Sequence, residues 1–244
     1  MYSAGLFFEE TMKTAAIIPS GGSGNRMGSD IPKQYLLMGG IPIMIHTLRV
    51  FQESTQIDDI FLILSAEYVE NAEKMIVQKY NLSKVIRILP GGKHRQDSVK
   101  SGIDALGAAY DIVVIHDGVR PFVSPELIKM AIGEAALAGA VSVGVPVKDT
   151  IKSLDAHGFV DKTLNRDKLW LTQTPQAFSA LLIQEAYRRA YEDNYYGTDD
   201  AALVERMGKK VKMLTGFYEN IKITTESDLR WGELFLKMRS EKLP

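Results

Sequence analysis

The sequence predicts an α/β fold built on a doubly wound, mostly parallel sheet. Apolar, strand-like runs alternate with helical segments up to about residue 145, which is the order of a parallel sheet with helices on both faces. Residues 59–64 and 112–115 are continuous apolar runs, typical of strands covered on both sides. The chain has 244 residues, 45% of them hydrophobic, which suits one large domain. Because ligands in such sheets bind at the carboxyl ends of strands, the turns after the strands are where we expect a site.

The first part of the chain gives the clearest elements. A buried strand at 15–18 leads into a glycine-rich loop, and a helix is expected near Pro42, whose fixed φ suits an early helical position. A second helix, 67–79, carries apolar residues near a 3.6-residue period. Ser124-Pro125 predicts another helix start, with a cap followed by proline. The strands expected up to this break are 15–18, 59–64, 85–89, 112–115 and 141–145, with further helices at 97–105 and 125–138.

The alternation of strands and helices breaks between residues 147 and 171. Two short strand candidates, 150–154 and 159–162, flank a turn and predict a β-hairpin with no helix to cover it. The hairpin carries apolar side chains, among them Phe159, and an exposed apolar hairpin favours a partner. We therefore expect a protruding arm and a homodimer. The elements expected after the arm are helices at 179–192 and 199–207, a strand at 211–214, a segment at 221–224 and a final helix from 225.

The loop at 19–28 is the strongest candidate for a functional motif. It reads Pro-Ser-Gly-Gly-Ser-Gly-Asn-Arg-Met-Gly, and Pro-Lys-Gln-Tyr follows at 32–35. Glycine permits the positive φ angles and the close approach by which backbone N–H groups bind an anion. Arg26 and Lys33 add two cations beside the loop. The expected ligand is therefore a polyphosphate. From the loop alone, the alternative is that it is a flexible turn with two surface cations and no ligand.

Three other glycine motifs do not fit this loop. A dinucleotide fingerprint needs glycine where Met27 stands, which disfavours an NAD-dependent oxidoreductase. A P-loop needs Gly-Lys-Ser/Thr, but Gly28 is followed by Ser29. A nucleophile elbow around Ser23 needs a glycine at position 25, which is Asn25.

The composition excludes several classes of function. The formal net charge of −1 disfavours a nucleic-acid-binding surface. The absence of cysteine excludes disulfides, thiolate nucleophiles and cysteine zinc sites. No apolar run approaches a membrane span, and residues 1–10 lack the features of a signal peptide. We expect a cytoplasmic protein without membrane or nucleic-acid partners, in which 12–244 form a single domain and 1–11 an N-terminal extension.

Taken together, the motifs resemble one group of nucleotidyltransferases. The glycine loop with Arg-Met-Gly and Pro-Lys-Gln is similar to the signature of sugar-nucleotide pyrophosphorylase-like enzymes. Over nearly the whole chain, the sequence resembles the 2-C-methyl-D-erythritol 4-phosphate cytidylyltransferases of the non-mevalonate isoprenoid pathway. The further blocks that carry this resemblance, in family order, are Gly91-Gly92 with Arg95 and Asp97-Ser98-Val99, His116-Asp117-Gly118-Val119-Arg120-Pro121, Val147-Lys148-Asp149-Thr150, Arg166 with Leu169-Trp170, Gln173-Thr174-Pro175-Gln176, Gly197-Thr198-Asp199-Asp200 and Asn220-Ile221-Lys222.

The resemblance implies a fold, a reaction and an assembly. The fold is a Rossmann-like nucleotidyltransferase fold with a protruding β-hairpin arm. The reaction transfers the cytidylyl group of CTP to 2-C-methyl-D-erythritol 4-phosphate with Mg²⁺ as cofactor, giving 4-diphosphocytidyl-2-C-methyl-D-erythritol and pyrophosphate. The assembly is a homodimer whose arms, residues 147–171, exchange across the interface, so that Arg166 serves the partner's site.

The resemblance also implies roles for individual residues. Arg26 and Lys33 match the residues that stabilise the pentacoordinate transition state, a task suited to fixed cations. Asp117 follows an apolar strand, and by analogy with related nucleotidyltransferases it is expected on the metal side of the site, with Asn220 as a helper. Mg²⁺ takes one or two carboxylates plus phosphate oxygens. His116 is expected to be structural. The residues expected to bind substrate are Ser20, Gly21, Gly22, Gly24, Gly92 and Ser98 on the nucleotide side, and Arg120, Thr150, Arg166 and Lys222 on the sugar-phosphate side.

Two departures from the family pattern and two alternatives stay open. Ser20-Gly21 stands where many members carry two alanines, and Lys93-His94 stands where acids are common. One alternative is a ribitol-5-phosphate cytidylyltransferase, against which the block at 166–170 argues. The other is a non-catalytic nucleotide-binding domain, which the presence of the two loop cations and the strand-end aspartate disfavours.

Overall fold

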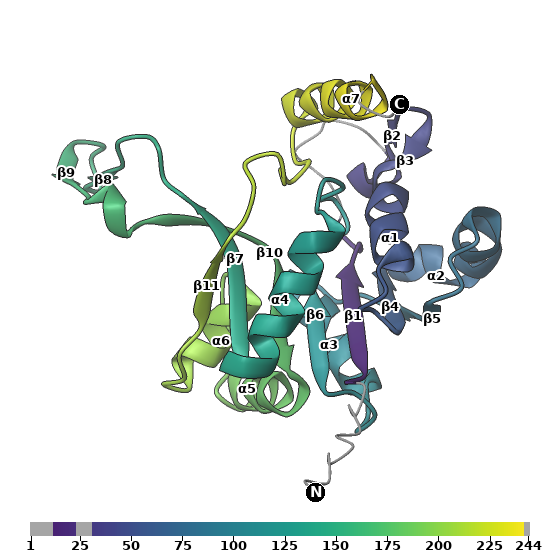
Figure 1. The fold of residues 1–244 in the computed structure, drawn as a ribbon. Helices are drawn as coiled ribbons and strands as arrows, with labels where there is room; N and C mark the ends of the chain where they lie inside the picture. Colours follow the sequence, from purple (N-terminus) through teal and green to yellow (C-terminus); the bar gives the residue numbers. More distant parts are fainter. Residues whose placement is uncertain (1–11, 23–30, 242–244) are drawn as a thin grey trace, which may run out of the picture.

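The computed structural model describes residues 12–22 and 31–241, and its main feature is a seven-stranded sheet (Figure 1). The strands of this sheet are β1 Thr14–Pro19, β4 Asp59–Leu64, β5 Val85–Pro90, β6 Ile112–Ile115, β7 Ala140–Pro146, β10 Trp170–Ser179 and β11 Lys212–Thr215. Their order is β11-β7-β10-β6-β1-β4-β5. Only β10 runs antiparallel to its neighbours in this sheet; the other neighbouring pairs are parallel. The predicted α/β fold with a mostly parallel sheet is confirmed.

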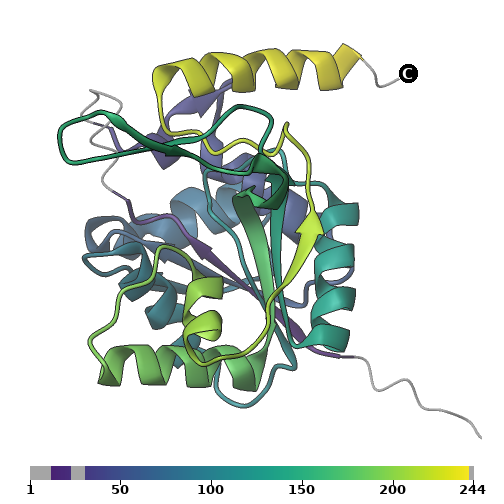
Figure 2. The same cartoon turned by 90° about the vertical axis from the view of Figure 1, so that its left-hand side faces the viewer.

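Helices cover both faces of the sheet (Figures 1 and 2). They are α1 Ile43–Glu53, α2 Ala66–Ala72, α3 Arg95–Ala105, α4 Pro125–Ala138, α5 Ala180–Glu192, α6 Asp200–Arg206 and α7 Glu226–Glu241. Short helical turns lie at Lys33–Tyr35, Glu73–Gln78 and Arg166–Lys168, and two small hairpins pair β2 Leu37–Met38 with β3 Ile41–Pro42 and β8 Lys152–Leu154 with β9 Val160–Thr163. Within the described ranges, no helix is both long and apolar enough to cross a bilayer.

The two faces of the sheet carry separate apolar clusters. Side chains alternate along a strand, so Ala16 and Ile18 of β1 belong to the cluster that includes α1, α2 and α4. Ala15 and Ile17 belong to the opposite cluster, which includes α3, α5 and α6. All four side chains are fully buried. The strand β1 is therefore an interior strand, paired with β6 and β4 and covered on both faces, and the loop that follows it starts from a rigid position.

The strand β10 is the main element that the sequence analysis misses. The sequence of β10 mixes polar and apolar residues and contains Pro175, and a proline inside a segment normally argues against a central strand. The register against β7 shifts between Thr172 and Gln176, which is where the proline lies. Gln176 is fully buried and donates through Nε2 to Ser142 Oγ of β7 at 3.0 Å. Pairing with two strands that are distant in sequence, and not local propensity, thus determines this strand.

A smaller correction concerns Pro42. This residue has φ −54° and ψ 138°, so it is extended, and α1 begins one residue later at Ile43. The proline instead closes the hairpin β2–β3, which turns at Gly39 and Gly40 with φ angles of +58° and +78°. The predicted helix is present, but the proline precedes it.

The hairpin β8–β9 stands away from the sheet on the segment 147–171, which we call the arm (Figure 1). The hairpin that was predicted here is confirmed. The large side chains near its turn point to solvent: Phe159 is 73% exposed, and Leu154 and Val160 are 60% and 58% exposed. The division into one domain and a dimerisation arm stays a prediction.

Candidate active site

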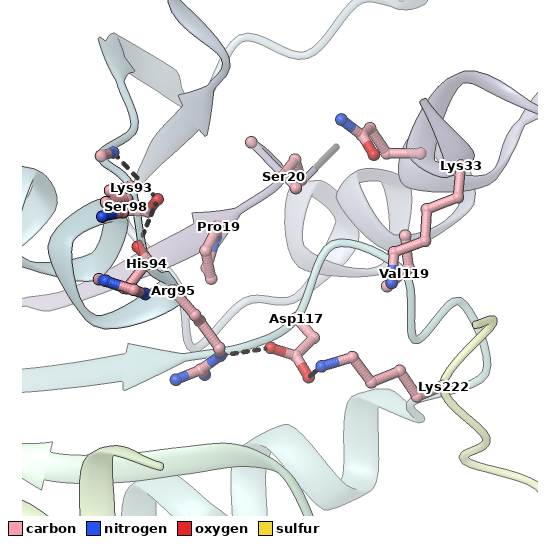
Figure 3. Close-up of a pocket in the computed structure, with 14 residues that line it drawn as sticks. Pro19, Ser20, Lys33, Lys93, His94, Arg95, Ser98, Asp117, Val119 and Lys222 are labelled. Atoms are coloured by element: carbon pink, nitrogen blue, oxygen red, sulfur yellow. Dashed lines mark hydrogen bonds and ion pairs between the residues drawn. The ribbon is translucent and has the colours of Figure 1, made fainter. Parts of the chain in front are cut away.

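The carboxyl ends of β1, β5 and β6 lie at the same edge of the sheet and border a cavity of about 400 Å³ (Figure 3). This is the edge at which α/β sheets bind ligands. The residues that line the cavity are Pro19, Ser20, Gly21, Gly22, Lys33, Gln34, Gly92, Lys93, His94, Arg95, Ser98, Asp117, Val119 and Lys222.

Two glycine turns form one wall of the cavity. The first follows β1 and the second follows β5, and each donates a backbone N–H to the end of β4. Ser20 N donates to Ile63 O, and Gly91 N donates to Leu64 O, both at 2.7 Å. A Cβ on Gly92 would lie 2.3 Å from a side-chain carbon in the first turn of α3, so a larger residue requires that helix to move. Glycine here lets the backbone approach a ligand closely.

The N-terminus of α3 is fixed beside the second turn. Asp97 accepts a backbone N–H at the start of the helix at 2.8 Å, and its Oδ1 accepts the hydroxyls of Tyr191 and Tyr196 at 2.5 and 2.8 Å. Burial raises the pKa of Asp97, but these hydrogen bonds lower it more, so the carboxylate is ionised. Ser98 Oγ accepts from Gly92 N at 3.2 Å and ties the helix to the glycine turn.

Asp117, just after β6, is the centre of a buried cluster of charges (Figure 3). Its Oδ1 accepts from Arg95 Nε at 2.8 Å, and its Oδ2 lies 2.8 Å from Lys222 Nζ and 3.6 Å from Arg120 Nε. Burial raises the pKa of Asp117, yet the charges of Arg95, Lys222 and Arg120 hold this pKa well below its ordinary value. The carboxylate is therefore ionised at neutral pH.

His116 is a structural residue, as predicted. It is fully buried, its Nε2 is 3.1 Å from Arg120 O, and its ring lies 5.0 Å from the ring of Phe51. Burial lowers the pKa of His116 to about 4. The imidazole is therefore neutral at pH 7, and His116 is not among the residues that line the cavity.

The structure brings together most of the predicted site residues. Those that line the cavity are Ser20, Gly21, Gly22, Lys33, Gly92, Ser98, Asp117 and Lys222. Arg120 joins them through its contact with the carboxylate of Asp117. Gly24 and Arg26 lie outside the described residues.

Two predicted residues lie apart from the cavity. Thr150 and Arg166 belong to the arm, and neither is among the residues that line the cavity of this chain. Arg166 Nη1 donates to Lys148 O at 2.7 Å, a contact within the base of the arm. Their assignment to a substrate site stays a prediction.

The residues fit a metal ion only if substrate supplies most of its ligands. The described residues contain no cluster of three or more histidine, aspartate or glutamate side chains that could hold a metal. Asp117 is the one carboxylate among the described lining residues, and both of its oxygens have cationic partners. Mg²⁺ is commonly bound by one or two carboxylates together with substrate phosphates. Asn220, predicted to help, is fully buried and donates through Nδ2 to Thr174 O at 2.8 Å, away from the lining.

Sequence reasoning missed the second acid of the charge cluster. Asp200 Oδ2 lies 2.9 Å from Arg95 Nη2, so Arg95 bridges two carboxylates. From the sequence, Thr198-Asp199-Asp200 is expected only to cap a helix and to support the site, with no ion pair or chemistry assigned to Asp200. A signal was present: two consecutive aspartates stand at the start of α6, and one of them, Asp199, suffices as the helix cap because it accepts from Ala202 N at 2.9 Å.

The chain is similar to known proteins over nearly its full length. A family model described as 2-C-methyl-D-erythritol 4-phosphate cytidylyltransferase matches residues 14–238. A protein of that name from Syntrophus aciditrophicus is 46% identical over 231 residues, which cover 95% of this chain and 99% of the relative. Another from Clostridioides difficile is 47% identical over 224 residues, which cover 92% and 94%. The solved structure of 4-diphosphocytidyl-2C-methyl-D-erythritol synthase from Anaerococcus prevotii is 35% identical, has a TM-score of 0.83, and covers 93% of this chain and 97% of its own.

Proposed function

The chain belongs to the 2-C-methyl-D-erythritol 4-phosphate cytidylyltransferase family, and we propose that its cavity transfers the cytidylyl group of CTP to 2-C-methyl-D-erythritol 4-phosphate. The products are 4-diphosphocytidyl-2-C-methyl-D-erythritol, an isoprenoid precursor, and pyrophosphate. The observation that carries this proposal is the group of four cations, Lys33, Lys93, Arg95 and Lys222, that line a cavity walled by two glycine turns. Such a cavity suits a triphosphate and a second phosphate.

The transfer needs one new bond and one broken bond. A phosphate oxygen of the methylerythritol substrate attacks the α-phosphorus of CTP. The bond from that phosphorus to the bridging oxygen breaks, and its electron pair leaves with pyrophosphate. The attacking phosphate is largely ionised at neutral pH because its second pKa is about 6, so the reaction requires no general base. This agrees with the buried, neutral His116.

Charge stabilisation is the main task of the protein in such a transfer. Lys33 lies on the helical turn Lys33–Tyr35 and lines the cavity, where its ammonium group can neutralise charge that builds up on the α-phosphate. We assign the same role to Arg26, which lies outside the described residues. On the nucleotide side, the N–H groups of the glycine turns and the hydroxyl of Ser98 suit the edge of a small pyrimidine.

The methylerythritol phosphate is assigned to the side of the cavity that holds Lys222. The Nζ atom of Lys222 now contacts Asp117 Oδ2 at 2.8 Å. A phosphate that enters beside this ammonium group competes for it, and Lys222 then contacts two anions. Arg120 lies on the same side, where its Nη1 donates to Asn220 O at 2.8 Å.

We include Mg²⁺ in the proposal as an ion carried by CTP. When bound, it would neutralise part of the charge of the triphosphate, held chiefly by phosphate oxygens and by Asp117. The argument for Asp117 is its ionised carboxylate at the cavity wall. Asp117 also keeps Arg95 and Lys222 in place.

The proposal also includes a homodimer in which each arm completes the partner's site. The exposed apolar side chains of the arm support it, since a protruding apolar hairpin is stabilised when a partner covers it. The position of Arg166 supports it too, because this residue is away from the cavity of its own chain. In a two-fold dimer, each arm would bring Arg166 and Thr150 to the other cavity.

The direct experiment is to incubate the purified chain with CTP, Mg²⁺ and each polyol phosphate and to follow pyrophosphate release. We expect turnover of the methylerythritol substrate. We expect Lys33→Ala to lower kcat by about 10²–10³-fold, the usual cost of losing one transition-state donor. Lys129→Ala, which removes an exposed lysine of α4, is the matched control and should be neutral. Efficient turnover of ribitol 5-phosphate with none of the methylerythritol substrate would contradict the proposal.

A further inference from the structure

We propose that Asp200, supported by Tyr187, is a positioning residue that holds Arg95 in place so that Arg95 can orient Asp117 for the transfer. This inference rests on the function proposed above. Asp200 lies at the start of α6 and Arg95 at the start of α3, and the two meet in the protein interior. Arg95 then extends to the cavity wall.

Asp200 is held from two sides. Its Oδ1 accepts the hydroxyl of Tyr187 of α5 at 2.5 Å, and its Oδ2 lies 2.9 Å from Arg95 Nη2. Its backbone N donates to Gln176 Oε1 of β10 at 3.1 Å. Both Asp200 and Tyr187 are only 1% exposed, so a bound substrate cannot reach them. Any effect of Asp200 on catalysis must therefore pass through a neighbour.

Asp200 is more than a structural part of the helix start. The cap of α6 is Asp199, whose Oδ1 accepts from Ala202 N at 2.9 Å. A buried carboxylate is costly unless it is paired and hydrogen-bonded. Asp200 meets this cost through Arg95, whose side chain is 29% exposed and forms part of the cavity wall. The pairing thus links the protein interior to the cavity.

The geometry gives Arg95 one defined orientation. The guanidinium is a planar fork, and its Nε and Nη2 point to two different carboxylates, those of Asp117 and Asp200. With both ends held, Arg95 occupies Oδ1 of Asp117 and leaves Oδ2 to Lys222 at 2.8 Å and Arg120 at 3.6 Å. Asp200 therefore acts on the position of Lys222, the cation assigned to the polyol phosphate, through two intermediate side chains.

The charge balance predicts how this role would differ from simple charge neutralisation. The cluster contains three cations, Arg95, Arg120 and Lys222, and two carboxylates, Asp117 and Asp200. Replacing Asp200 by asparagine makes the cluster more positive, which by itself favours anionic substrates. A fall in kcat without a rise in KM for CTP would thus indicate lost positioning.

The test uses the full-length chain and the variants Asp200→Asn and Tyr187→Phe. Asparagine keeps the size of the side chain and one acceptor, and phenylalanine removes only the hydroxyl that supports Asp200. We expect Asp200→Asn to lower kcat by about 10–100-fold, since displacement of a positioned group by about 1 Å can cost 10²-fold. We expect Tyr187→Phe to lower kcat by about 2–5-fold, since it leaves the ion pair intact. KM for CTP should stay within about two-fold in both variants.

Two comparisons separate positioning from a structural role. Asp199→Ala removes the cap at the same end of α6 and should lower the melting temperature while leaving kcat within about two-fold. In an Arg95→Lys background, where the planar fork is gone, Asp200→Asn should lower kcat by less than about two-fold. The same 10–100-fold loss in both backgrounds would overturn the inference, because Asp200 would then act without Arg95.

Activity of the unmodified chain separates this inference from the proposed function. If the unmodified chain does not turn over CTP and methylerythritol phosphate, the proposed function fails, and this inference fails with it. If the unmodified chain is active and Asp200→Asn and Tyr187→Phe keep full kcat, only the positioning role is wrong. If Asp200→Asn does not fold, Tyr187→Phe is tested instead, both in the unmodified chain and in the Arg95→Lys background. The inference holds if Tyr187→Phe lowers kcat in the unmodified chain and has no effect in the Arg95→Lys background.

Discussion

The charge cluster around Asp117 and the arm at 147–171 differ in whether their side chains find partners within the chain. In the cluster, Asp117 finds three cations within the chain at 2.8 to 3.6 Å, although it is buried. In the arm, Phe159 is 73% exposed although it is apolar, and Arg166 bonds only to the backbone at the base of the arm among its described hydrogen bonds. The first region is complete within one chain. The second exposes apolar side chains, which the second chain of the proposed homodimer would cover.

The largest expected effect comes from the cluster. Asp117→Ala leaves Arg95, Arg120 and Lys222 close together without their shared carboxylate. Breaking a buried pair in this way costs about 3–5 kcal/mol of unfolding free energy. Activity should fall by at least about 10³-fold, because both sides of the cavity lose their orientation. Denaturant unfolding and pyrophosphate release measure the two effects.

The matched control for this variant is an exposed acid. Asp104→Ala removes a carboxylate that pairs with Lys100 on the surface of α3 and has a side chain that is 59% exposed. Such a pair contributes at most about 0.5 kcal/mol. If Asp117→Ala were as mild as Asp104→Ala, the view that the cluster is held within the chain would be wrong.

His116 gives a pH test of the same region. The pKa of His116 falls from 6.5 to about 4 because the residue is buried. Between these values the unfolded chain binds the proton more readily than the folded chain does, so stability is full above pH 6.5 and falls as the pH drops toward 4. This residue alone should account for about 3 kcal/mol over that range.

The measurement is the unfolding free energy of the chain and of His116→Gln at several pH values from 7 to 4.5. The variant should be less stable at pH 7 but should lose less stability with acid. Parallel curves for the two proteins would show that His116 does not titrate as its burial requires.

The arm should respond differently. Phe159→Asp should weaken the dimer by about 10–100-fold, as expected for an apolar residue buried at the centre of an interface. The stability of the dissociated chain should not change, because Phe159 is exposed there. Sedimentation over a range of concentrations measures the dissociation constant. Leu181→Asp, at another exposed apolar residue, 79% exposed on α5, is the control and should leave the dimer intact. Equal effects of the two variants would remove the arm from the interface.

The smallest expected effect concerns Ser20 and Gly118. A Cβ on Gly118 would lie 1.9 Å from Ser20 Oγ and 3.2 Å from Ser20 Cβ. Gly118→Ala should therefore cost about 1 kcal/mol of stability through overpacking. Ser20→Ala should remove much of that cost, and a double-mutant cycle of unfolding free energies measures this. Equal costs of Gly118→Ala in both backgrounds would show that the backbone, and not Ser20, requires glycine.

Much of the fold follows from local pattern, and the rest depends on distant contacts. The runs that form β4 and β6 can be recognised without knowing their partner strands, because a strand that is buried on both faces is apolar at nearly every position. The strand β10 could not be seen in this way, since its polar Gln176 is stabilised by Ser142 and the start of α6.

The candidate site also has parts that local sequence pattern predicts and parts that depend on distant contacts. Glycine turns and strand-end residues such as Asp117 are predictable, because sheet topology fixes where strands end. The link from Arg95 to Asp200 was not predictable, since it joins the starts of two helices that are far apart in sequence. The expectation that Arg166 serves a neighbouring site rests on the family resemblance and not on local pattern, because it concerns a contact between two chains.

The most direct measurement of whether the arm completes the partner's site uses mixed dimers. Lys33→Ala damages the cavity of its own chain, and Arg166→Ala damages the arm that serves the other chain. Each variant alone should be nearly inactive. In a mixed dimer one site carries both changes and the other carries neither. After random exchange about half of the dimers are mixed, so activity should recover to about a quarter of that of the unmodified enzyme. If mass spectrometry shows that the chains have exchanged and activity does not recover, each chain builds its site alone and the account of the arm is wrong.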